Sequence, residues 1–225
     1  MPDHAHIYKP FDAELRSLKD QILAMGGLCE AHIAEATRAL IERDAAIAGR
    51  VIEADRAVDH LELAIDEQCI RVLALRQPAA SDLRFLAAAL KIVTQLERVG
   101  DLAVNMAERV IALCAEPPLH AVVDLPRMAA AAQSMLRRSL DAFVSGDAAR
   151  AREVLAADDE VDAMMRAVFT ELRALMEKDP SAVGRGIATI FFAKHLERVA
   201  DHTTNIAEMV VFLAEGKDVR HPRAR

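Results

Sequence analysis

The sequence repeats one pattern in both of its halves. The stretch LERVGDLAVNMAERV occupies residues 96–110, and LERVADHTTNIAEMV occupies residues 196–210. Upstream, Asp55-x-x-Val-Asp59 returns as Asp158-x-x-Val-Asp162. A similarity that covers most of both halves predicts two units of the same fold arranged in tandem.

Prolines and apolar periodicity divide each half into helices. Proline inside a helix costs about 3 kcal/mol, so Pro78, Pro180 and the Pro117–Pro126 region mark helix ends. Between them, apolar residues recur every three or four positions. The predicted helices span residues 12–43, 45–76, 81–114, 125–145, 147–177 and 182–215. Asp44 and Asp147 stand where N-caps belong, and Ser81 and Ser181 are expected to cap the helices after the two proline turns.

The fold class that follows is all-α, with two tandem three-helix bundles. Hydrophobic residues make up 53% of the chain and aromatic residues only 4%, a composition rich in helix formers. Short connections make neighbouring helices antiparallel. We expect a first bundle at 11–116, a linker at 117–124 and a second bundle at 125–216.

Composition also excludes several classes of function. A net charge of −7 gives nucleic acid little to bind, because phosphates are held by clustered cations. Cys29, Cys69 and Cys114 have neither disulfide-framework nor zinc-knuckle spacing, which fits a reducing compartment. No apolar run is long enough to cross a membrane, and the N-terminus does not resemble a signal peptide. We therefore expect a soluble, cytoplasmic protein.

The repeated stretch carries acids opposite its apolar stripe. On a helical wheel the polar side of the first copy holds Glu97, Asp101, Asn105 and Glu108. The same side of the second copy holds Glu197, Asp201, Asn205 and Glu208. On the preceding helix of the first half, one face carries Asp55, Asp59, Glu62 and Asp66.

Distances from the proline turn predict that these acids meet. Asp59 and Glu97 each lie 19 residues from Pro78, and Asp55 and Asp101 each lie 23 residues from it. Two residues at equal distances from the turn of an antiparallel helical hairpin lie at the same height along the two helix axes. In the second half the same argument about Pro180 brings together Asp158, Asp162, Glu197 and Asp201.

Two interpretations of the acids compete. Single acids usually belong to solvated faces, and Arg98 and Arg198 are expected to flank the clusters rather than neutralise them. Against that, like charges four residues apart on a helix destabilise it, and each repulsion across helices at about 4 Å adds about 1 kcal/mol even in water. A bound cation removes this penalty, and carboxylates suit hard metal ions. The spacing therefore favours metal binding. Asn105, Glu108, Asn205 and Glu208, which share the polar side, are candidates for further ligands.

Catalytic motifs are missing from the sequence. The absence of E-x-x-H argues against a ferritin-like di-iron oxidase. No Gly-rich phosphate loop, nucleophile elbow or Cys–His pair can be recognised. The sequence predicts no enzyme.

Two copies of E-R-V-x-D, each on the last helix of a three-helix unit, resemble the PhoU family of bacterial phosphate-signalling regulators. The stretch Pro78-Ala-Ala-Ser-Asp82-Leu-Arg84 also resembles that family's first repeat. The resemblance covers about residues 11–213. It implies multinuclear metal clusters of iron or zinc, held at Glu97/Asp101, Glu197/Asp201, Asp55/Asp59 and Asp158/Asp162. The carboxylate chemistry itself also suits manganese or magnesium.

The same resemblance implies a negative regulator of phosphate uptake and of the phosphate-starvation response. Its implied partners are the ATPase subunit of the phosphate ABC transporter, a sensor histidine kinase and a second copy of the chain. Asp82 and Arg84 are candidates for a partner contact, with helix-start electrostatics as the simpler explanation. The chain departs from an even repeat where Glu62 and Asp66 correspond to Met165 and Phe169. The alternatives are a metal-buffering helical protein and an accessory protein of another ion transporter.

Overall fold

The structure, a computed structural model, describes residues 9–119 and 123–216 and contains helices but no strand in these ranges. The helices are α1 (Lys9–Glu42), α2 (Ala45–Ala54), α3 (Arg56–Arg76), α4 (Ala80–Cys114), α5 (Leu125–Ser145), α6 (Ala148–Lys178) and α7 (Val183–Glu215). A single 3₁₀ turn, Pro180–Ala182, precedes α7. The all-α prediction is confirmed. Part of the expected linker, residues 120–122, lies outside the described residues.

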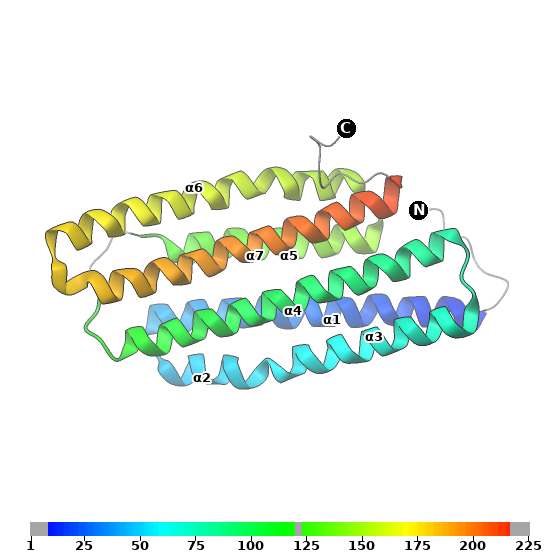
Figure 1. Ribbon diagram of the computed structural model, residues 1–225, viewed down its shortest axis with the longest axis horizontal. Coiled ribbons are helices and arrows are strands. Elements are labelled where there is room, and N and C mark those ends of the chain that lie inside the picture. Colours follow the sequence, from blue (N-terminus) through cyan, green and yellow to red (C-terminus); the bar gives the residue numbers. More distant parts are fainter. Residues whose placement is uncertain (1–8, 120–122, 217–225) are drawn as a thin grey trace.

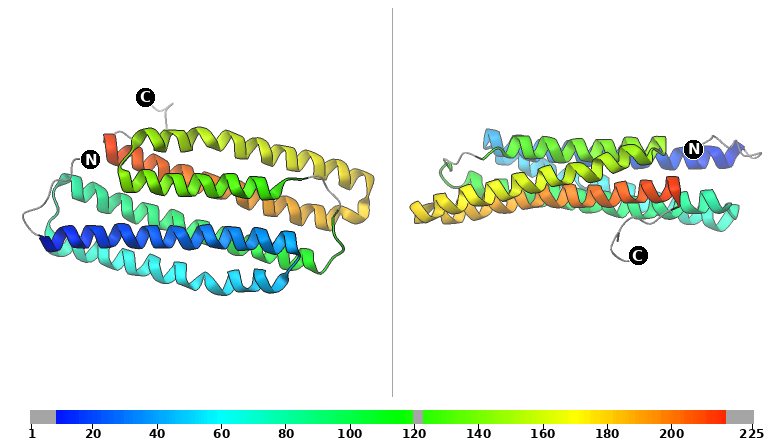
Figure 2. Two further views of the ribbon diagram at one scale, coloured as in Figure 1. Left: turned by 180° about the vertical axis from the view of Figure 1, so that it is seen from behind. Right: turned by 90° about the horizontal axis from the view of Figure 1, so that it is seen from above.

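Two elongated bundles lie side by side. One consists of α1, the α2–α3 pair and α4, and the other of α5, α6 and α7 (Figure 1). The bundles meet through two helix pairs, α4 against α7 on one side and α1 against α5 on the other (Figure 2). The repeated stretches on α4 and α7 are therefore neighbours in space. Within the described ranges, no helix is both long and apolar enough to cross a membrane.

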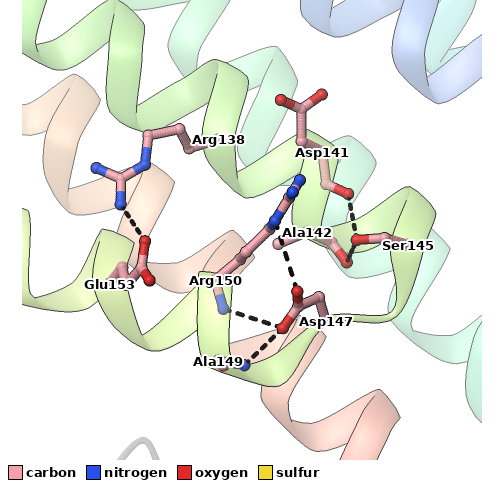
Figure 3. Close-up of polar contacts among 8 residues, drawn as sticks. All are labelled: Arg138, Asp141, Ala142, Ser145, Asp147, Ala149, Arg150 and Glu153. Carbon is pink, nitrogen blue, oxygen red and sulfur yellow. Dashed lines mark hydrogen bonds and ion pairs between the residues drawn. The ribbon is translucent and has the colours of Figure 1, made fainter.

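Aspartates cap two helices as predicted. Asp44 accepts hydrogen bonds from the backbone N–H groups of Ala46 and Ile47. At the α5–α6 turn, Asp147 Oδ1 accepts from Ala149 N at 2.9 Å and from Arg150 N at 3.1 Å (Figure 3). These bonds satisfy backbone donors that the first helical turn leaves without partners.

The expected serine caps were wrong. Asp179, and not Ser181, provides the cap at the second proline turn, because Asp179 Oδ1 accepts from Ser181 N at 3.0 Å. At the first turn the N-cap position is Ala79, with no side-chain hydrogen bond. Ser81 is the second residue of α4, and Ser181 lies within the 3₁₀ turn, so neither stands at the position before a helix.

The predicted helix 45–76 is broken at Asp55, whereas its counterpart α6 is continuous. Asp55 ends α2 and begins α3, and its carbonyl accepts from Val58 N at 2.8 Å, a bond of 3₁₀ type. A 3₁₀-type bond within a helix marks a local departure from α-helical geometry. The Asp55 side chain points into the bundle, which the helical wheel of an unbroken helix does not predict.

The core confirms the apolar stripe of the repeat. The residues of that stripe that the structure buries completely are Ile92, Leu96, Val99, Ala103, Met106 and Val110. Cys29 and Cys69 are buried among them as free thiols, and burial raises the pKa of each to about 12. Such thiols remain protonated and unreactive at neutral pH.

Candidate functional site

A cluster of carboxylates lies between α3 and α4 in the first bundle. Burial raises the pKa of Glu97, and the charges of Asp101, Glu62 and Asp59 raise it further, while Arg98 opposes them. The pKa of Glu62 is likewise raised by burial and then by its acidic neighbours, which include Asp59 and Asp101. The acids of the two helices therefore face one another, and Glu62 belongs to the set.

Asp55 does not join this cluster through its side chain. Its Oδ1 lies 3.7 Å from Nδ1 of His32 on α1, and both atoms are buried without a hydrogen-bond partner. A Cβ built on Gly100 would lie 2.8 Å from the same oxygen. Asp55 thus stands level with Gly100 and Asp101, as the distance from the turn predicts, but it faces the interior.

The second bundle holds the matching cluster between α6 and α7. Burial raises the pKa of Asp158 to about 6, and Asp201, Asp162 and Glu197 contribute to the increase. The pKa of Asp201 is raised by burial and then by Glu197, with a smaller contribution from Asp162. All four predicted acids are therefore close enough to influence one another.

Cations neutralise part of each cluster. Arg98 lies 3.4 Å from Glu97 and 3.7 Å from Asp101, so it pairs with the acids instead of only flanking them. In the second bundle Lys194 donates to Glu197 Oε1 at 2.6 Å. Arg198 is exposed, and its charge lowers the pKa values of His195 and His202, which burial lowers first.

Two of the four further candidate ligands, Asn205 and Glu108, lie close to residues of the other bundle. Asn205 Nδ2 donates to Gln95 Oε1 on α4 at 3.0 Å, which places this amide at the α4–α7 contact. Glu108 lies 3.6 Å from Arg109, and its charge raises the pKa of His195 on α7, against the larger lowering by burial. Their repeat equivalents, Asn105 and Glu208, are half-buried on α4 and α7.

The candidate partner residues differ in exposure. Asp82, in the first turn of α4, is only 9% exposed. Arg84 is exposed. A partner approaching this end of α4 therefore meets the arginine and not the aspartate.

The donor chemistry of both clusters fits a hard metal ion. Each cluster provides four carboxylates on two antiparallel helices. The raised pKa values of Glu62 and Glu97 in the first cluster and of Asp158 and Asp201 in the second reflect burial and negative charge without full compensation. Within residues 9–119 and 123–216, however, no three or more His, Cys, Asp or Glu side chains are already arranged as a metal site. The acids supply the charge and the ligand type, and coordination would require new carboxylate rotamers.

Three residues around these sites, His32, Lys194 and Gln95, were not identified from the sequence. His32 follows Cys29 by three residues, so it lies on an apolar stripe, and a histidine at such a position is the signal that could have identified it. Lys194 lies three residues before Glu197, a helical spacing at which opposite charges attract. Gln95 gave no signal, because its role depends on contact with the other half.

A family model described as the PhoU domain matches the chain twice, at residues 22–110 and 125–210. The sequence is 42% identical over 217 residues to the phosphate-specific transport system accessory protein PhoU homolog of Pseudomonas aeruginosa, covering 96% of this chain and 90% of that protein. It is 35% identical over 216 residues to the accessory protein PhoU of Serratia marcescens, with coverage of 96% and 89%.

Solved structures match over nearly the whole chain. The crystal structure of PhoU from Pseudomonas aeruginosa superposes with a TM-score of 0.88 at 41% identity, covering 92% of this chain and all of that one (100%). The phosphate transport system regulatory protein PhoU from Streptococcus pneumoniae gives a TM-score of 0.86 at 32% identity, with coverage of 93% and 99%.

Proposed function

The chain belongs to the PhoU family, and on this basis we propose that it is an accessory protein of a phosphate-specific transport system and a negative regulator of phosphate uptake. The observation that carries the proposal is the pair of PhoU-domain matches, one in each bundle. Relatives that share 35% to 42% of its residues over almost the full length carry the name of accessory protein. The role is regulatory and not catalytic.

The proposed partners follow from this role. The protein acts from the cytoplasm on the ATPase subunit of the phosphate ABC transporter and on a sensor histidine kinase, and it represses the phosphate-starvation response when phosphate is plentiful. It associates with these membrane complexes peripherally and forms a homodimer. Exposed Arg84 is a candidate contact, because it lies at the accessible end of α4.

Metal ions belong to the same proposal. Asp59, Glu62, Glu97 and Asp101 would hold a cation in the first bundle, with Asp55 available if its side chain turns outward. Asp158, Asp162, Glu197 and Asp201 would hold one in the second. A bound cation would neutralise the mutual repulsion of the acids and fix α3 to α4 and α6 to α7. Iron, zinc, manganese and magnesium are the candidate ions.

Deletion of the gene tests the regulatory role. A strain that lacks the protein but retains an intact transporter should transcribe its phosphate-starvation genes in rich phosphate medium. Restoring the wild-type gene should return repression. Normal repression in the deletion strain would contradict the proposal.

A matched pair of complementing variants separates the role of the metal clusters from that of the fold. Glu97→Ala with Asp101→Ala removes two cluster acids, and Glu53→Ala with Glu171→Ala removes the same charge from exposed positions outside both clusters. We expect the control pair to restore repression and the cluster pair to restore it incompletely. Equal repression by both would show that the clusters are dispensable for regulation.

A further inference from the structure

A pocket of about 450 Å³ opens on the line where the two bundles meet. It is lined by Leu90, Lys91, Thr94, Gln95, Asn205 and Met209. The first four residues come from α4 and the last two from α7, which lie side by side along this line (Figure 1). The volume is typical of small-molecule sites, which cover about 300–1,000 Å³.

A hydrogen-bond network holds the polar wall of the pocket in place. Gln95 Oε1 accepts from Asn205 Nδ2 at 3.0 Å and lies 2.9 Å from His202 Nδ1. Since the amide oxygen can only accept, Nδ1 of His202 carries its proton. Both amide groups are thereby fixed in orientation.

The network leaves donors that point to a ligand with an anionic group. With its oxygen occupied twice, Gln95 retains an Nε2 group that donates to no other group among the described residues. Lys91 is exposed and forms no ion pair within residues 9–119 and 123–216. An ammonium and an amide N–H beside each other suit a carboxylate or a phosphate. Leu90 and the buried Met209 provide apolar surface next to these donors.

The internal repeat shows that the pocket is not a general consequence of the fold. The positions that correspond to Lys91, Thr94 and Met209 in the other repeat are Phe191, Lys194 and Arg109. Lys194 is held by Glu197, so a long side chain occupies the place of a small threonine. The opening therefore depends on side chains found on only one side of the pseudo-symmetric contact.

We propose that this pocket binds a small amphipathic anion, with a carboxylate or phosphate group on Lys91 and Gln95 and an apolar body against Leu90 and Met209. The site is separate from both carboxylate clusters. Because the ligand would touch α4 and α7 at once, it would bind across the two repeats.

Phenyl phosphate is a suitable probe because it combines both features. Titration of the ¹⁵N-labelled full chain, followed by NMR, should shift backbone signals of residues 90–95 and 205–209 and give a saturable binding curve. Phenol and inorganic phosphate, which each carry half of the chemistry, should bind at least about tenfold more weakly, as expected from losing one charged hydrogen bond or the apolar contacts. Equal affinity for phenol would overturn the anionic part of the proposal, and equal affinity for inorganic phosphate the apolar part.

Variants locate the binding. Lys91→Gln should lower the affinity for phenyl phosphate about tenfold, and Leu90→Trp should prevent binding by filling the pocket. Arg50→Gln, which removes an exposed cation from α2, should leave the affinity unchanged. Circular dichroism melts establish that each variant is folded. Signal shifts confined to other regions, no saturable binding by the wild type, or unchanged affinity in folded Lys91→Gln would overturn the proposal.

Discussion

Nδ1 of His32 lies 3.7 Å from Oδ1 of Asp55, and both atoms are buried without a hydrogen bond. The Asp55 side chain is 14% exposed and stands at the break between α2 and α3. The second bundle has no equivalent pair, because Met135 corresponds to His32 while Asp158 corresponds to Asp55. The two bundles therefore place the same aspartate in different environments.

A double-mutant cycle should detect coupling between these two residues. His32→Met leaves a buried carboxylate without its partner and should lower the free energy of unfolding by about 1–3 kcal/mol. Asp55→Asn should lower the free energy of unfolding by less in the His32→Met protein than in the wild type. The difference, which is the interaction energy of the pair, should be about 0.5–3 kcal/mol. Urea denaturation measures all four proteins.

The control cycle combines His32→Met with Asp141→Asn, an exposed aspartate on α5. Those two changes should add within about 0.5 kcal/mol. Additivity of the His32 and Asp55 changes to the same degree would mean that the buried pair does not interact.

Gly100 should tolerate no side chain despite lying in the middle of a helix. Alanine is normally favoured over glycine there by about 1 kcal/mol. At Gly100, however, the new Cβ would lie 2.8 Å from Asp55 Oδ1 and 3.2 Å from Val58 Cγ1. Overpacking of this kind costs about 1–3 kcal/mol, so Gly100→Ala should reduce stability to denaturant.

Gly49 provides the control, because a Cβ at that helical position would meet nothing within 4 Å. Gly49→Ala should therefore stabilise the protein by about 1 kcal/mol. Stabilisation of the protein by both substitutions would contradict the close packing of Asp55 against Gly100 of α4.

Asp158 should make stability depend on pH in metal-free protein. Its pKa of about 6 in the folded state exceeds the ordinary aspartate value of about 3.9, because burial and the neighbouring acids disfavour its charge. Its contribution to stability is therefore complete below about pH 4 and is lost as the pH rises through 6. His195 and His202, whose pKa values burial lowers, act in the opposite direction as the pH falls.

The effect of Asp158 is isolated by comparison with Asp158→Asn. Melting temperatures in chelator at pH 5 and pH 7 should show a smaller gain, or a larger loss, on acidification in the variant than in the wild type. Exposed Asp141→Asn should retain the wild-type response. An unaltered pH response in Asp158→Asn would contradict the role assigned to this carboxyl group.

Sequence reasoning was most successful where distance along the chain decides the outcome. The height of the acids followed from their separation from Pro78 and Pro180, and two N-caps followed from the residues at helix starts. The direction of Asp55 did not follow, because a helical wheel assumes an unbroken helix. The Gln95–Asn205 contact could not be predicted either, since it depends on how the two bundles pack against each other.

We propose that each bundle builds its own metal-binding carboxylate cluster. Glu97→Ala with Asp101→Ala removes two acids of the first cluster but leaves the buried stripe of α4 intact, so the fold should persist. Relief of repulsion should even slightly stabilise the metal-free form. Glu197→Ala with Asp201→Ala is the counterpart in the second cluster, and Glu53→Ala with Glu171→Ala controls for lost charge.

Metal content per chain, measured by inductively coupled plasma mass spectrometry on purified protein, tests this claim most directly. Each cluster variant should lose the metal of its own bundle and keep that of the other, while the control retains all of it. Thermal melts should show that chelator destabilises the wild type and affects each cluster variant less. Unchanged metal content in the Glu97/Asp101 variant, or no specific metal in the wild type, would contradict the proposal. The acids would then form an ordinary solvated surface.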